Sequence, residues 1–501
     1  MARFYIENFG CRATQADGAE LERQFLERGL ERAGAARDAE IVVLNTCTVT
    51  GSADKDARAS IRRLQRVNPD CRILVTGCYA QRAPEELAAL PGVTWVVGNS
   101  HKHQAADIAT SSFPFSRDDV TASGSSSTSG FVPLGQLSNR PGNVIVGDIF
   151  AHTELLAAPV FEAANERTRP NLKVQDGCDN RCSFCVIPYV RGQSRSLPRE
   201  RVIAEVRTLV EAGYREVVIS GINLGRWGRD LESSSQLSAL GSQLKSAADS
   251  LRLELLIKCI LEQTSVEKLR ISSVEPMDWS DELIGLVSSS ERIAKHAHVP
   301  MQSGSDAVLR RMHRKYRPWH YREKILKIRA AMPTAAIGAD VMVGFPAETE
   351  SEFGETRCMI EELPFTYLHV FTYSARPGTR AAEQSGQVRV EVARERNRVL
   401  REIASKKKVA FMQSLVGTVV EAITLQSGGK EFTEAMTDNY LKMRIFGPHA
   451  PNRWIDLKVE GVSGEMILGK PLVNQSREPA FSEPGNRVGG DWGVRVQEQT
   501  H

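Results

Sequence analysis

The sequence of 501 residues lacks any run of eighteen or more apolar residues, which excludes a conventional transmembrane helix. It also lacks the pattern of a secretory leader, because Met1–Ile6 leads directly into strand-like sequence. The net charge of +3 is too small to indicate nucleic-acid binding without a local basic patch. These absences predict a cytoplasmic protein with no membrane partner, and the length predicts two to four domains.

Cysteine is scarce, and the nine cysteines are an odd number spread along the chain. That distribution does not match the framework of a disulfide-stabilised secreted domain. In a reducing compartment, grouped cysteines indicate metal binding or catalysis instead. We interpret the ungrouped Cys71, Cys259 and Cys358 as small core residues.

The chain divides by composition into an α/β amino-terminal region, a polar segment, a second α/β region and a short β-rich region. The first region alternates strands and helices in the order typical of a doubly wound parallel sheet. The polar segment contains the Ser- and Gly-rich run 122–130, which is typical of a linker. We predict an amino-terminal domain at 1–105, a Ser-rich linker at 106–168, a central domain at 169–405, a small β-barrel at 412–473 and a disordered tail at 474–501.

The central region contains six strand candidates separated by helical segments, a pattern that predicts a partial (β/α)6 barrel. A Ser-rich stretch at 233–250 interrupts it and is interpreted as a surface insertion. The six strand candidates are Leu172–Val174, Glu216–Ser220, Leu269–Ser272, His296–Met301, Ala339–Val343 and Tyr367–Thr372.

Three cysteines lie close together after the first of these strands. Cys178, Cys182 and Cys185 have the spacing C-x3-C-x2-C. Three thiolates so close can bind one iron–sulfur cluster and leave one iron open for a ligand, because such clusters normally take four cysteines. A structural zinc loop is the alternative, although zinc loops more often contain paired C-x2-C halves. The motif resembles the signature of the radical S-adenosylmethionine superfamily.

A second set of three cysteines is dispersed over the amino-terminal region. Cys11, Cys47 and Cys78 each follow a predicted strand directly. The carboxyl ends of parallel strands lie at one edge of a sheet, so we expect these thiols to meet in space. They predict a second three-cysteine cluster site, and the alternative is three buried thiols.

Further candidate ligands lie at the ends of later strands in the central region. Glycines there bring the backbone close to a ligand, and polar side chains offer hydrogen bonds to a ribose or an amino group. Each segment alone is more often a turn or a helix cap, but together they fit one pocket for S-adenosylmethionine. The candidates are Gly221, Asn223, Ser273, Glu275, Gln302 and Gly344.

The two cysteine sets, in this order, resemble the methylthiotransferase family of radical S-adenosylmethionine enzymes over nearly the whole chain. Further similar segments are 10–12, 45–50, 77–81, 272–276, 298–306, 344–350 and 373–379. The terminal β-region is similar to the TRAM domain, a small RNA-binding barrel. The segments 45–50 and 433–440 most resemble the MtaB-type branch. One departure is Ala347, at a position where the family has glycine; it is tolerable if the φ angle there is negative.

The resemblance implies two [4Fe–4S] clusters and S-adenosylmethionine as cofactors. It implies that the central cluster cleaves S-adenosylmethionine to a 5′-deoxyadenosyl radical, and that the enzyme adds a methylthio group to the adenine ring of N6-threonylcarbamoyladenosine beside the tRNA anticodon. It further implies an electron donor such as a flavodoxin or ferredoxin and a source of sulfur, and we expect a monomer. Isopentenyladenosine in tRNA and an aspartate of a ribosomal protein stay open as alternative substrates. A non-catalytic iron–sulfur or zinc protein that binds RNA is an alternative of another class.

The best candidate for an RNA-binding surface is the basic stretch Arg310–Arg329, in which aromatic residues are interleaved. Its cations can contact phosphates and its aromatics can stack on unpaired bases. The candidate contacts are Arg310, Arg314, Lys315 and Tyr316. The alternative is an ordinary amphipathic helix whose aromatic residues pack inward.

Overall fold

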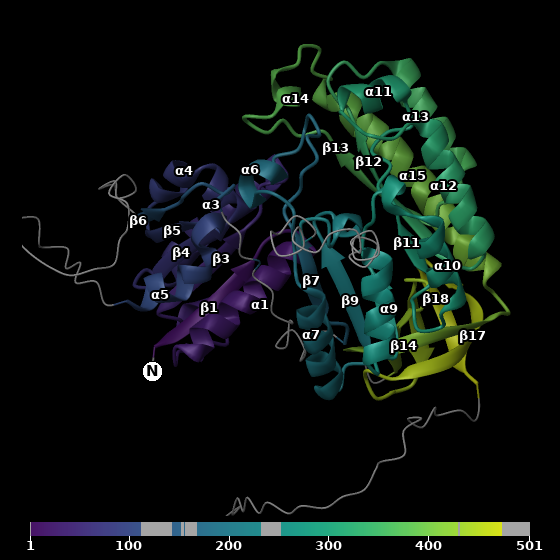
Figure 1. The fold of residues 1–501 in the computed structure, drawn as a ribbon, viewed down its shortest axis with the longest axis horizontal. Helices are drawn as coiled ribbons and strands as arrows, with labels where there is room; N and C mark the ends of the chain where they lie inside the picture. The colour runs from purple at the N-terminus through teal and green to yellow at the C-terminus, as the bar shows by residue number, and fades with distance from the viewer. Residues whose placement is uncertain are drawn as a thin grey trace, which may run out of the picture.

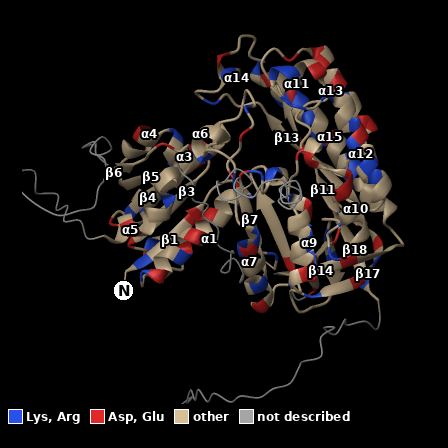
Figure 2. Cartoon of the chain, in the orientation of Figure 1, with Lys and Arg blue, Asp and Glu red and all other residues tan. Residues whose placement is uncertain are grey.

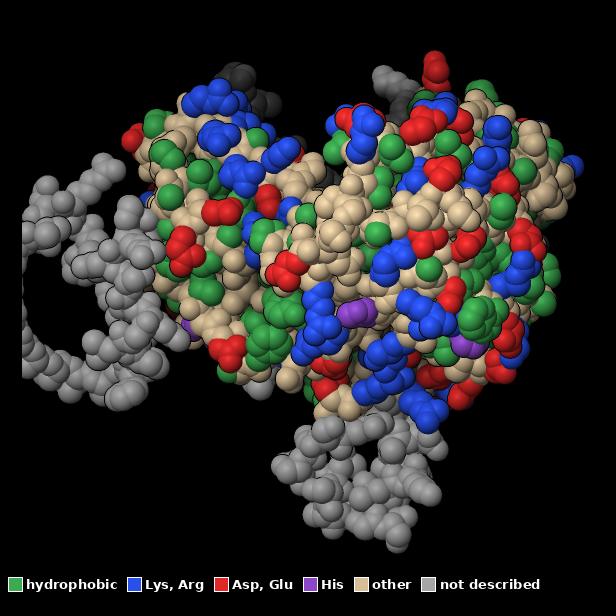
Figure 3. Space-filling model, turned by 90° about the horizontal axis from the view of Figure 1, so that it is seen from above, with side chains coloured by type: hydrophobic (Ala, Val, Ile, Leu, Met, Phe, Trp, Pro, Cys, Tyr) green, Lys and Arg blue, Asp and Glu red, His purple; other side chains and the backbone are tan. Residues whose placement is uncertain are grey.

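The computed structural model describes residues 2–111, 143–151, 155, 168–231, 252–428 and 431–472. It contains an amino-terminal α/β lobe, a larger central α/β lobe and a β-barrel packed against the end of the central lobe (Figure 1). Seen from above, a notch separates the amino-terminal lobe from the central lobe (Figure 3). Among the described residues, no helix has both the length and the apolar character needed to cross a membrane.

The amino-terminal lobe is built on a sheet of six parallel strands in the order β2-β1-β3-β4-β5-β6. Every residue of β3 is buried, as expected for a strand with helices on both faces. The strands are β1 (Arg3–Asn8), β2 (Glu31–Arg32), β3 (Ile41–Thr46), β4 (Arg72–Gly77), β5 (Val93–Gly98) and β6 (Asn143–Ile145). The helices are α1 (Arg12–Glu27), α2 (Gly51–Val67), α3 (Cys78–Arg82), α4 (Pro84–Ala88) and α5 (Ala105–Thr110).

The central lobe contains the six parallel strands that the sequence predicts, arranged as an open barrel of two sheets. One sheet has the order β10-β9-β7-β8 and the other β11-β12-β13. The backbone of Leu269 and Ile293 bridges the two sheets in parallel fashion. The strands are β7 (Asn171–Asp176), β8 (Arg195–Ser196), β9 (Glu216–Gly221), β10 (Lys268–Ile271), β11 (His296–His298), β12 (Ala336–Val343) and β13 (Tyr367–Thr372).

Helices cover the outer face of this open barrel (Figure 1). Alternate residues such as Val217, Val341 and Val370 point outward and join one apolar core with these helices, so the intervening residues face the interior. Helix α13 begins with a capping box between Thr349 and Glu352. The helices are α6 (Ile187–Arg191), α7 (Arg199–Glu211), α9 (Leu253–Gln263), α10 (Asp281–Ser289), α11 (Asp306–Arg311), α12 (Pro318–Ala331), α13 (Glu350–Glu362), α14 (Arg380–Glu383) and α15 (Val390–Ser414).

The long helix α15 leads into a closed barrel of five strands in the order β14-β15-β16-β18-β17. Inward-facing Ala422, Met443 and Leu457 belong to its core. The strands are β14 (Val419–Gly428), β15 (Phe432–Thr437), β16 (Lys442–Phe446), β17 (Trp454–Ser463) and β18 (Met466–Pro471). The turn at 437–441 contacts the central lobe, where the main-chain oxygen of Asp438 accepts a hydrogen bond from Arg270.

The predicted fold class, a doubly wound sheet followed by a partial (β/α)6 barrel and a small β-barrel, is confirmed. One difference concerns Asn143–Ile145, which the sequence analysis placed in the linker but which extends the first sheet by pairing with β5. A three-residue edge strand has too little periodicity to be recognised in sequence. The Ser-rich segments 122–130 and 233–250 and the predicted tail at 474–501 lie outside the described residues, and the domain boundaries stay predictions.

Candidate cluster and cofactor sites

Cys11, Cys47 and Cys78 lie together at the carboxyl edge of the amino-terminal sheet. Cys11 is the N-cap of α1, Cys47 follows β3 and Cys78 begins α3. A side chain at Gly10 would overlap the Cβ of Cys47 at 2.4 Å, so the chain around Cys11 needs this glycine to approach Cys47. Burial and the neighbouring charges of Cys78 and Cys11 raise the pKa of Cys47 to about 12. A bound metal would have to displace that proton.

Asn99, which was not predicted from the sequence, contacts the first cysteine set. The Nδ2 of Asn99 donates to the Sγ of Cys78 at 3.6 Å and to the main-chain oxygen of Val190 at 2.7 Å. Asn99 therefore ties the first cysteine set to α6 of the central lobe. Hydrogen bonds to cysteine sulfur are one means by which a protein sets the potential of an iron–sulfur cluster.

A buried network of charges joins the two lobes beside the first cysteine set. Lys102, Lys173 and Arg191 surround the carboxylate of Asp17, and Lys173 and Arg191 also contact Asp176. Burial alone would raise the pKa of Asp17, but Arg191, Lys102 and Lys173 outweigh it and hold that pKa well below its usual value. Three cations face two carboxylates, and negative charge on Cys78 and Cys11 further favours the charged form of Arg191. The network therefore places positive charge beside thiols that must ionise to bind metal.

Cys178, Cys182 and Cys185 lie in the loop between β7 and α6. The Sγ of Cys178 accepts from the main-chain N–H of Asn180 at 3.4 Å and from the Nδ2 of Asn223 at 3.6 Å. Burial and the charges of Cys182 and Cys178 raise the pKa of Cys185 to about 12, so the three thiols lie within electrostatic reach of one another. As in the first set, a metal would have to displace protons from buried thiols.

Neither set has the geometry of a site for a single ion. Within the described part of the chain, no three His, Cys, Asp or Glu side chains converge closely enough to hold one metal ion. A four-iron cluster is wider than one ion, and its ligands bind different irons, so its cysteines stand further apart. The donor set of three thiolates suits iron–sulfur clusters.

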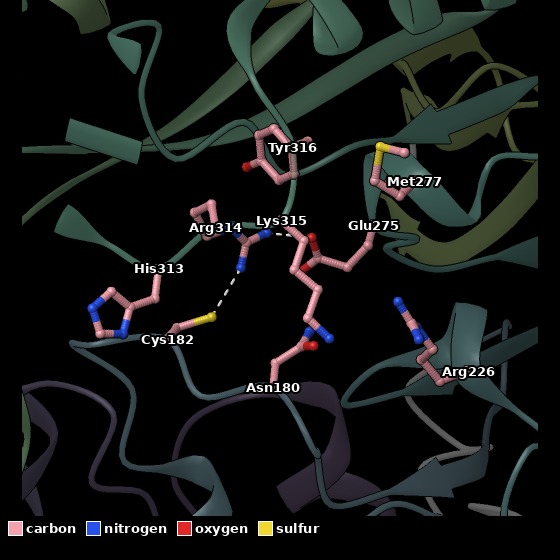
Figure 4. A pocket seen from close by; sticks show the side chains of 9 residues that line it. All are labelled: Asn180, Cys182, Arg226, Glu275, Met277, His313, Arg314, Lys315 and Tyr316. Carbon is pink, nitrogen blue, oxygen red and sulfur yellow. Dashed lines mark hydrogen bonds and ion pairs between the residues drawn. The ribbon is translucent and has the colours of Figure 1, made fainter. Parts of the chain in front are cut away.

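A pocket opens beside Cys182, and its side chains converge from four segments of the chain (Figure 4). The Nη1 of Arg314 donates to the Sγ of Cys182 at 3.3 Å, and the same guanidinium is paired with Glu275. Burial, which Arg314 partly offsets, raises the pKa of Glu275. Lys315 also lines the pocket and is exposed. This pocket adjoins the second cysteine set and is charged, as a site for an amino-acid cofactor requires.

Three buried oxygens near the same strand ends have no hydrogen-bond partner among the described residues. They belong to Ser220 at the end of β9, to Asn223 just beyond it and to Ser272 after β10. Native proteins satisfy nearly all buried polar groups. These oxygens therefore fit a hydrogen-bonding ligand such as S-adenosylmethionine at the carboxyl ends of the barrel strands.

The six predicted cofactor contacts do not all have the same surroundings. Asn223 contacts Cys178 and Glu275 lines the pocket beside Cys182, as a cofactor site there requires. Ser273 is partly exposed and lies next to the unpaired Ser272. The three others are constrained by the protein itself: a side chain at Gly221 would meet Gln175, one at Gly344 would meet Ala393, and the backbone of Gln302 has a φ of 63°.

The basic stretch Arg310–Arg329 resembles the amphipathic helix of the alternative reading more than an open RNA surface. Tyr316 is 1% exposed and Arg314 8%, so these two expected contacts are not available at the outer surface. Arg310 pairs with Asp306, Arg322 with Glu362 and Lys327 with Asp281. Figure 2 shows blue segments of the ribbon on α12, on the outer side of the central lobe, with red segments close by. Of the four candidates, Lys315 alone combines exposure with a position at the pocket.

The backbone at Ala347 does not meet the condition stated from the sequence, which was a negative φ angle. Its φ is 58°, in the left-handed region where a Cβ is unfavourable. Its N–H donates to the main-chain oxygen of Gly386 at 2.7 Å, which fixes this conformation. Ala347 therefore carries a local strain that glycine would not.

Comparison with known proteins agrees with both halves of the site. Residues 3–98 match the model described as uncharacterized protein family UPF0004, and residues 172–359 match the radical SAM superfamily. The threonylcarbamoyladenosine tRNA methylthiotransferase MtaB of Bacillus subtilis is 36% identical over 89% of this chain and 91% of its own length. The chain belongs to the MtaB-type family of radical S-adenosylmethionine methylthiotransferases. It is therefore a transferase that uses S-adenosylmethionine and two [4Fe–4S] clusters.

Other relatives extend the same result. The MtaB protein of Aquifex aeolicus is 33% identical over 88% of this chain and 96% of its own length. A tRNA-2-methylthio-N(6)-dimethylallyladenosine synthase of Erythrobacter litoralis is 32% identical over 85% of this chain and 87% of its own length. The relatives of this chain therefore include proteins that are named for two different modified adenosines.

Proposed function

We propose that this enzyme adds a methylthio group to the adenine ring of N6-threonylcarbamoyladenosine beside the anticodon of tRNA. The observation that carries the proposal is the pair of cysteine sets in two lobes joined by a buried charge network, in a chain with an MtaB relative at 36% identity. The Erythrobacter litoralis relative that is named for dimethylallyladenosine is less similar to this chain, at 32% identity. No feature of the described residues favours a ribosomal protein as substrate.

In this proposal, Cys11, Cys47 and Cys78 hold one cluster and Cys178, Cys182 and Cys185 hold the other. The central cluster, held by Cys178, Cys182 and Cys185, would supply radical chemistry together with S-adenosylmethionine, which can activate a ring C–H bond that acid–base chemistry cannot. The protein has to position the two clusters and the nucleotide against one another and exclude water. The Asp17 network performs part of that task, because it fixes the amino-terminal lobe against β7 and α6.

S-adenosylmethionine is proposed to lie between the central cysteine set and the ends of β9 and β10. The unpaired oxygens of Ser220, Asn223 and Ser272 would accept hydrogen bonds from its ribose or amino group. The Arg314–Glu275 pair would hold the charged amino-acid part beside Cys182. Gly221, Ser273, Gln302 and Gly344 remain proposed as residues that shape this site rather than as shown contacts.

The carboxy-terminal barrel is proposed to be TRAM-like and to contact the tRNA. Phe446 on β16 is 90% exposed, and the guanidinium of Arg444 on the same strand lies 4.1 Å from the ring of Phe432. An exposed aromatic beside cations is suited to stack on unpaired bases, and each such contact contributes about 1–3 kcal/mol. Lys315 is proposed to contact phosphate near the pocket. An electron donor such as a flavodoxin or ferredoxin, a sulfur source, a monomeric state and a cytoplasmic location complete the proposal.

Nucleoside analysis of tRNA from a strain that lacks this gene tests the function directly. We expect threonylcarbamoyladenosine to accumulate without its methylthio derivative, and the wild-type gene to restore that derivative. A Cys182→Ala gene expressed at the same level is the matched control and should fail to restore it. Loss of a methylthiolated isopentenyladenosine instead, or no change in tRNA nucleosides, would overturn the proposal.

A further inference from the structure

Arg12, the residue after Cys11, extends from the amino-terminal lobe to the interior of the central barrel. Its Nη2 donates to the hydroxyl of Tyr440 at 3.1 Å, and its main-chain oxygen accepts from Asn171 of β7 at 3.2 Å. The guanidinium is partly exposed and has no acidic partner among the residues that the structure describes. An arginine held inside a protein without a carboxylate is suited to bind an anionic ligand.

Tyr440 explains why Arg12 stays in this position. Tyr440 comes from the carboxy-terminal barrel, and its ring lies 4.8 Å from that of His296 on β11. The guanidinium of Arg270 lies 5.4 Å from the same ring, and that of Arg169 lies 5.8 Å away. The phenol hydroxyl is therefore fixed by cation–π and ring contacts, and it orients Arg12 without neutralising its charge.

The interior face of the second sheet carries a directed chain of hydrogen bonds. The hydroxyl of Tyr367 lies 2.7 Å from the Nε2 of His296 and 3.0 Å from the Nδ1 of His298. The Nε2 of His298 lies 3.2 Å from the carboxylate of Asp340. If Nε2 of His298 donates to Asp340, its Nδ1 accepts from Tyr367, whose oxygen in turn accepts from His296. This arrangement engages one oxygen of the Asp340 carboxylate.

His369 on β13 is the member of this group that remains available. Its ring stacks on that of His298 at 5.5 Å, it is exposed, and its nitrogens make no hydrogen bond within the described ranges. The ring of His369 lies 5.3 Å from that of Tyr367, and the Tyr367 ring lies 6.1 Å from that of Tyr440, which holds Arg12. Burial and the charge of His298, partly offset by Asp340, lower the pKa of His369. Phe371, two residues further along β13, is 47% exposed and offers an apolar surface beside it.

We propose that Arg12 and His369 bind the carboxylate of the threonylcarbamoyl group and thereby select this substrate over an adenosine with an uncharged N6 substituent. The inference rests on the proposed function and adds to it the residues that recognise the substrate. The threonylcarbamoyl group carries one carboxylate and one hydroxyl, whereas an isopentenyl group carries neither. Arg12 supplies the charge, His369 supplies a ring N–H, and Phe371 packs against the apolar part of the nucleotide.

The paired state of Asp340 fits this assignment. Asp340, on the neighbouring strand β12, contacts the Nε2 of His298 rather than Arg12, so the charge of Arg12 is not taken up by this carboxylate. The location next to Cys11 also fits, because the modified adenine must come close to the first cluster. Arg12 is thus a specificity-determining residue rather than a cluster ligand.

The test compares two anticodon stem-loop RNAs with the reconstituted enzyme. One carries threonylcarbamoyladenosine, and the other carries the corresponding threoninamide, in which an uncharged amide replaces the carboxylate. For the wild-type enzyme we expect kcat/KM, and binding measured by fluorescence anisotropy, to be about ten- to a hundredfold better with the carboxylate. The ratio of the kcat/KM for the carboxylate RNA to that for the amide RNA should fall in both Arg12→Gln and His369→Ala. It should fall to near one in Arg12→Gln, whereas Arg12→Lys should retain part of it.

Arg63→Gln is the matched control, because Arg63 lies in the same lobe and pairs with Glu7 on its surface. It should keep the wild-type ratio. If the wild-type enzyme methylthiolates both RNAs equally well, the inference is wrong while the proposed function stands. If it acts on neither, the proposed function itself fails. Arg12→Gln could lose iron because Arg12 lies next to Cys11. In that case the His369→Ala variant decides the test, and a preference for the carboxylate RNA equal to that of the wild type would refute the inference.

Discussion

The two cysteine sets reach a similar arrangement by different routes. Cys178, Cys182 and Cys185 lie in one loop, so their approach depends mainly on local backbone conformation. Cys11, Cys47 and Cys78 follow three different strands and approach one another only when the parallel sheet is assembled. The first set also depends on contacts between lobes, through Asn99 and the Asp17 network. The comparison teaches that one cluster site is local and the other is a property of tertiary structure.

The largest expected effect separates the chemical roles of the two sets. Cys182→Ala should reduce formation of 5′-deoxyadenosine to the uncatalysed background, because it removes a proposed ligand of the cluster that cleaves S-adenosylmethionine. Cys47→Ala should leave cofactor cleavage but abolish the methylthiolated product. Both products are measured by liquid chromatography and mass spectrometry. Cys358→Ala, at an exposed cysteine outside both sets, is the control; equal loss of both products in the Cys47 variant would contradict the division of roles.

The next effect concerns the buried charge network between the two lobes, in which Lys173 pairs with Asp17 and Asp176. Lys173→Met leaves Asp17 and Asp176 short of a cation in a fully buried site, which costs about 3–5 kcal/mol. We expect a lower urea midpoint and preferential loss of iron from the first cluster. The surface pair Arg322–Glu362 is the control, since Arg322→Gln should cost less than about 1 kcal/mol. Equal effects of the two substitutions would contradict the importance of the network.

The same network predicts a dependence on pH. The pKa of Asp17 in the folded protein is held below that of an unfolded aspartate, by Arg191, Lys102 and Lys173 against the effect of burial. Its contribution to stability is therefore fully present above about pH 4 and is lost as the pH falls through the folded value. Unfolding of the wild type followed at decreasing pH should show this loss, and Lys173→Met should show a smaller one.

A smaller effect is expected at Ala347, which belongs to neither set. Its φ of 58° is unfavourable for a residue with a Cβ. Ala347→Gly should therefore stabilise the protein by about 1 kcal/mol, measured as an increase in urea midpoint. Ala347→Val should destabilise it, because a branched Cβ adds to the same strain. A lower midpoint for the glycine variant would show that the strain is relieved elsewhere in the chain.

The smallest expected effect is a change in the reduction potential of each cluster when one hydrogen bond to a cysteine sulfur is removed. Asn223→Ala removes a donor to Cys178, and Asn99→Ala removes a donor to Cys78. Each should lower the midpoint potential of its own cluster by about 40 mV, the equivalent of about 1 kcal/mol for one electron. Potentiometric titration followed by electron paramagnetic resonance resolves the two clusters. A shift of both potentials in either variant would show that the clusters are not independent.

The features that could be predicted from the sequence are those that depend on neighbouring residues in the chain. All six central strands could be located from their apolar runs, and the amino-terminal cysteines could be placed at one sheet edge because each follows a strand. The edge strand Asn143–Ile145 was missed because three residues in a polar segment carry no periodic signal. The φ of Ala347 could not be inferred either, because it is fixed by a hydrogen bond to Gly386, a distant residue.

Most of the polar residues around the two sites could not be found in sequence. Arg314 and Tyr316 belong to a basic, aromatic stretch that suggests RNA, and only the packing of that stretch against Cys182 and Glu275 reveals their burial. Asp17, Lys173 and Arg191 lie far apart in the chain and have no motif, so their pairing is visible only in three dimensions. Charge patterns in one sequence show which groups exist but not which partners they have.

Iron and zinc analysis of the anaerobically reconstituted protein tests the central claim most directly. The account predicts about eight irons per chain and little zinc in the wild type, and about four irons when either Cys11, Cys47 and Cys78 or Cys178, Cys182 and Cys185 are replaced together by alanine. Zinc in place of iron, or about four irons in the wild type with no further loss when the first set is replaced, would contradict it.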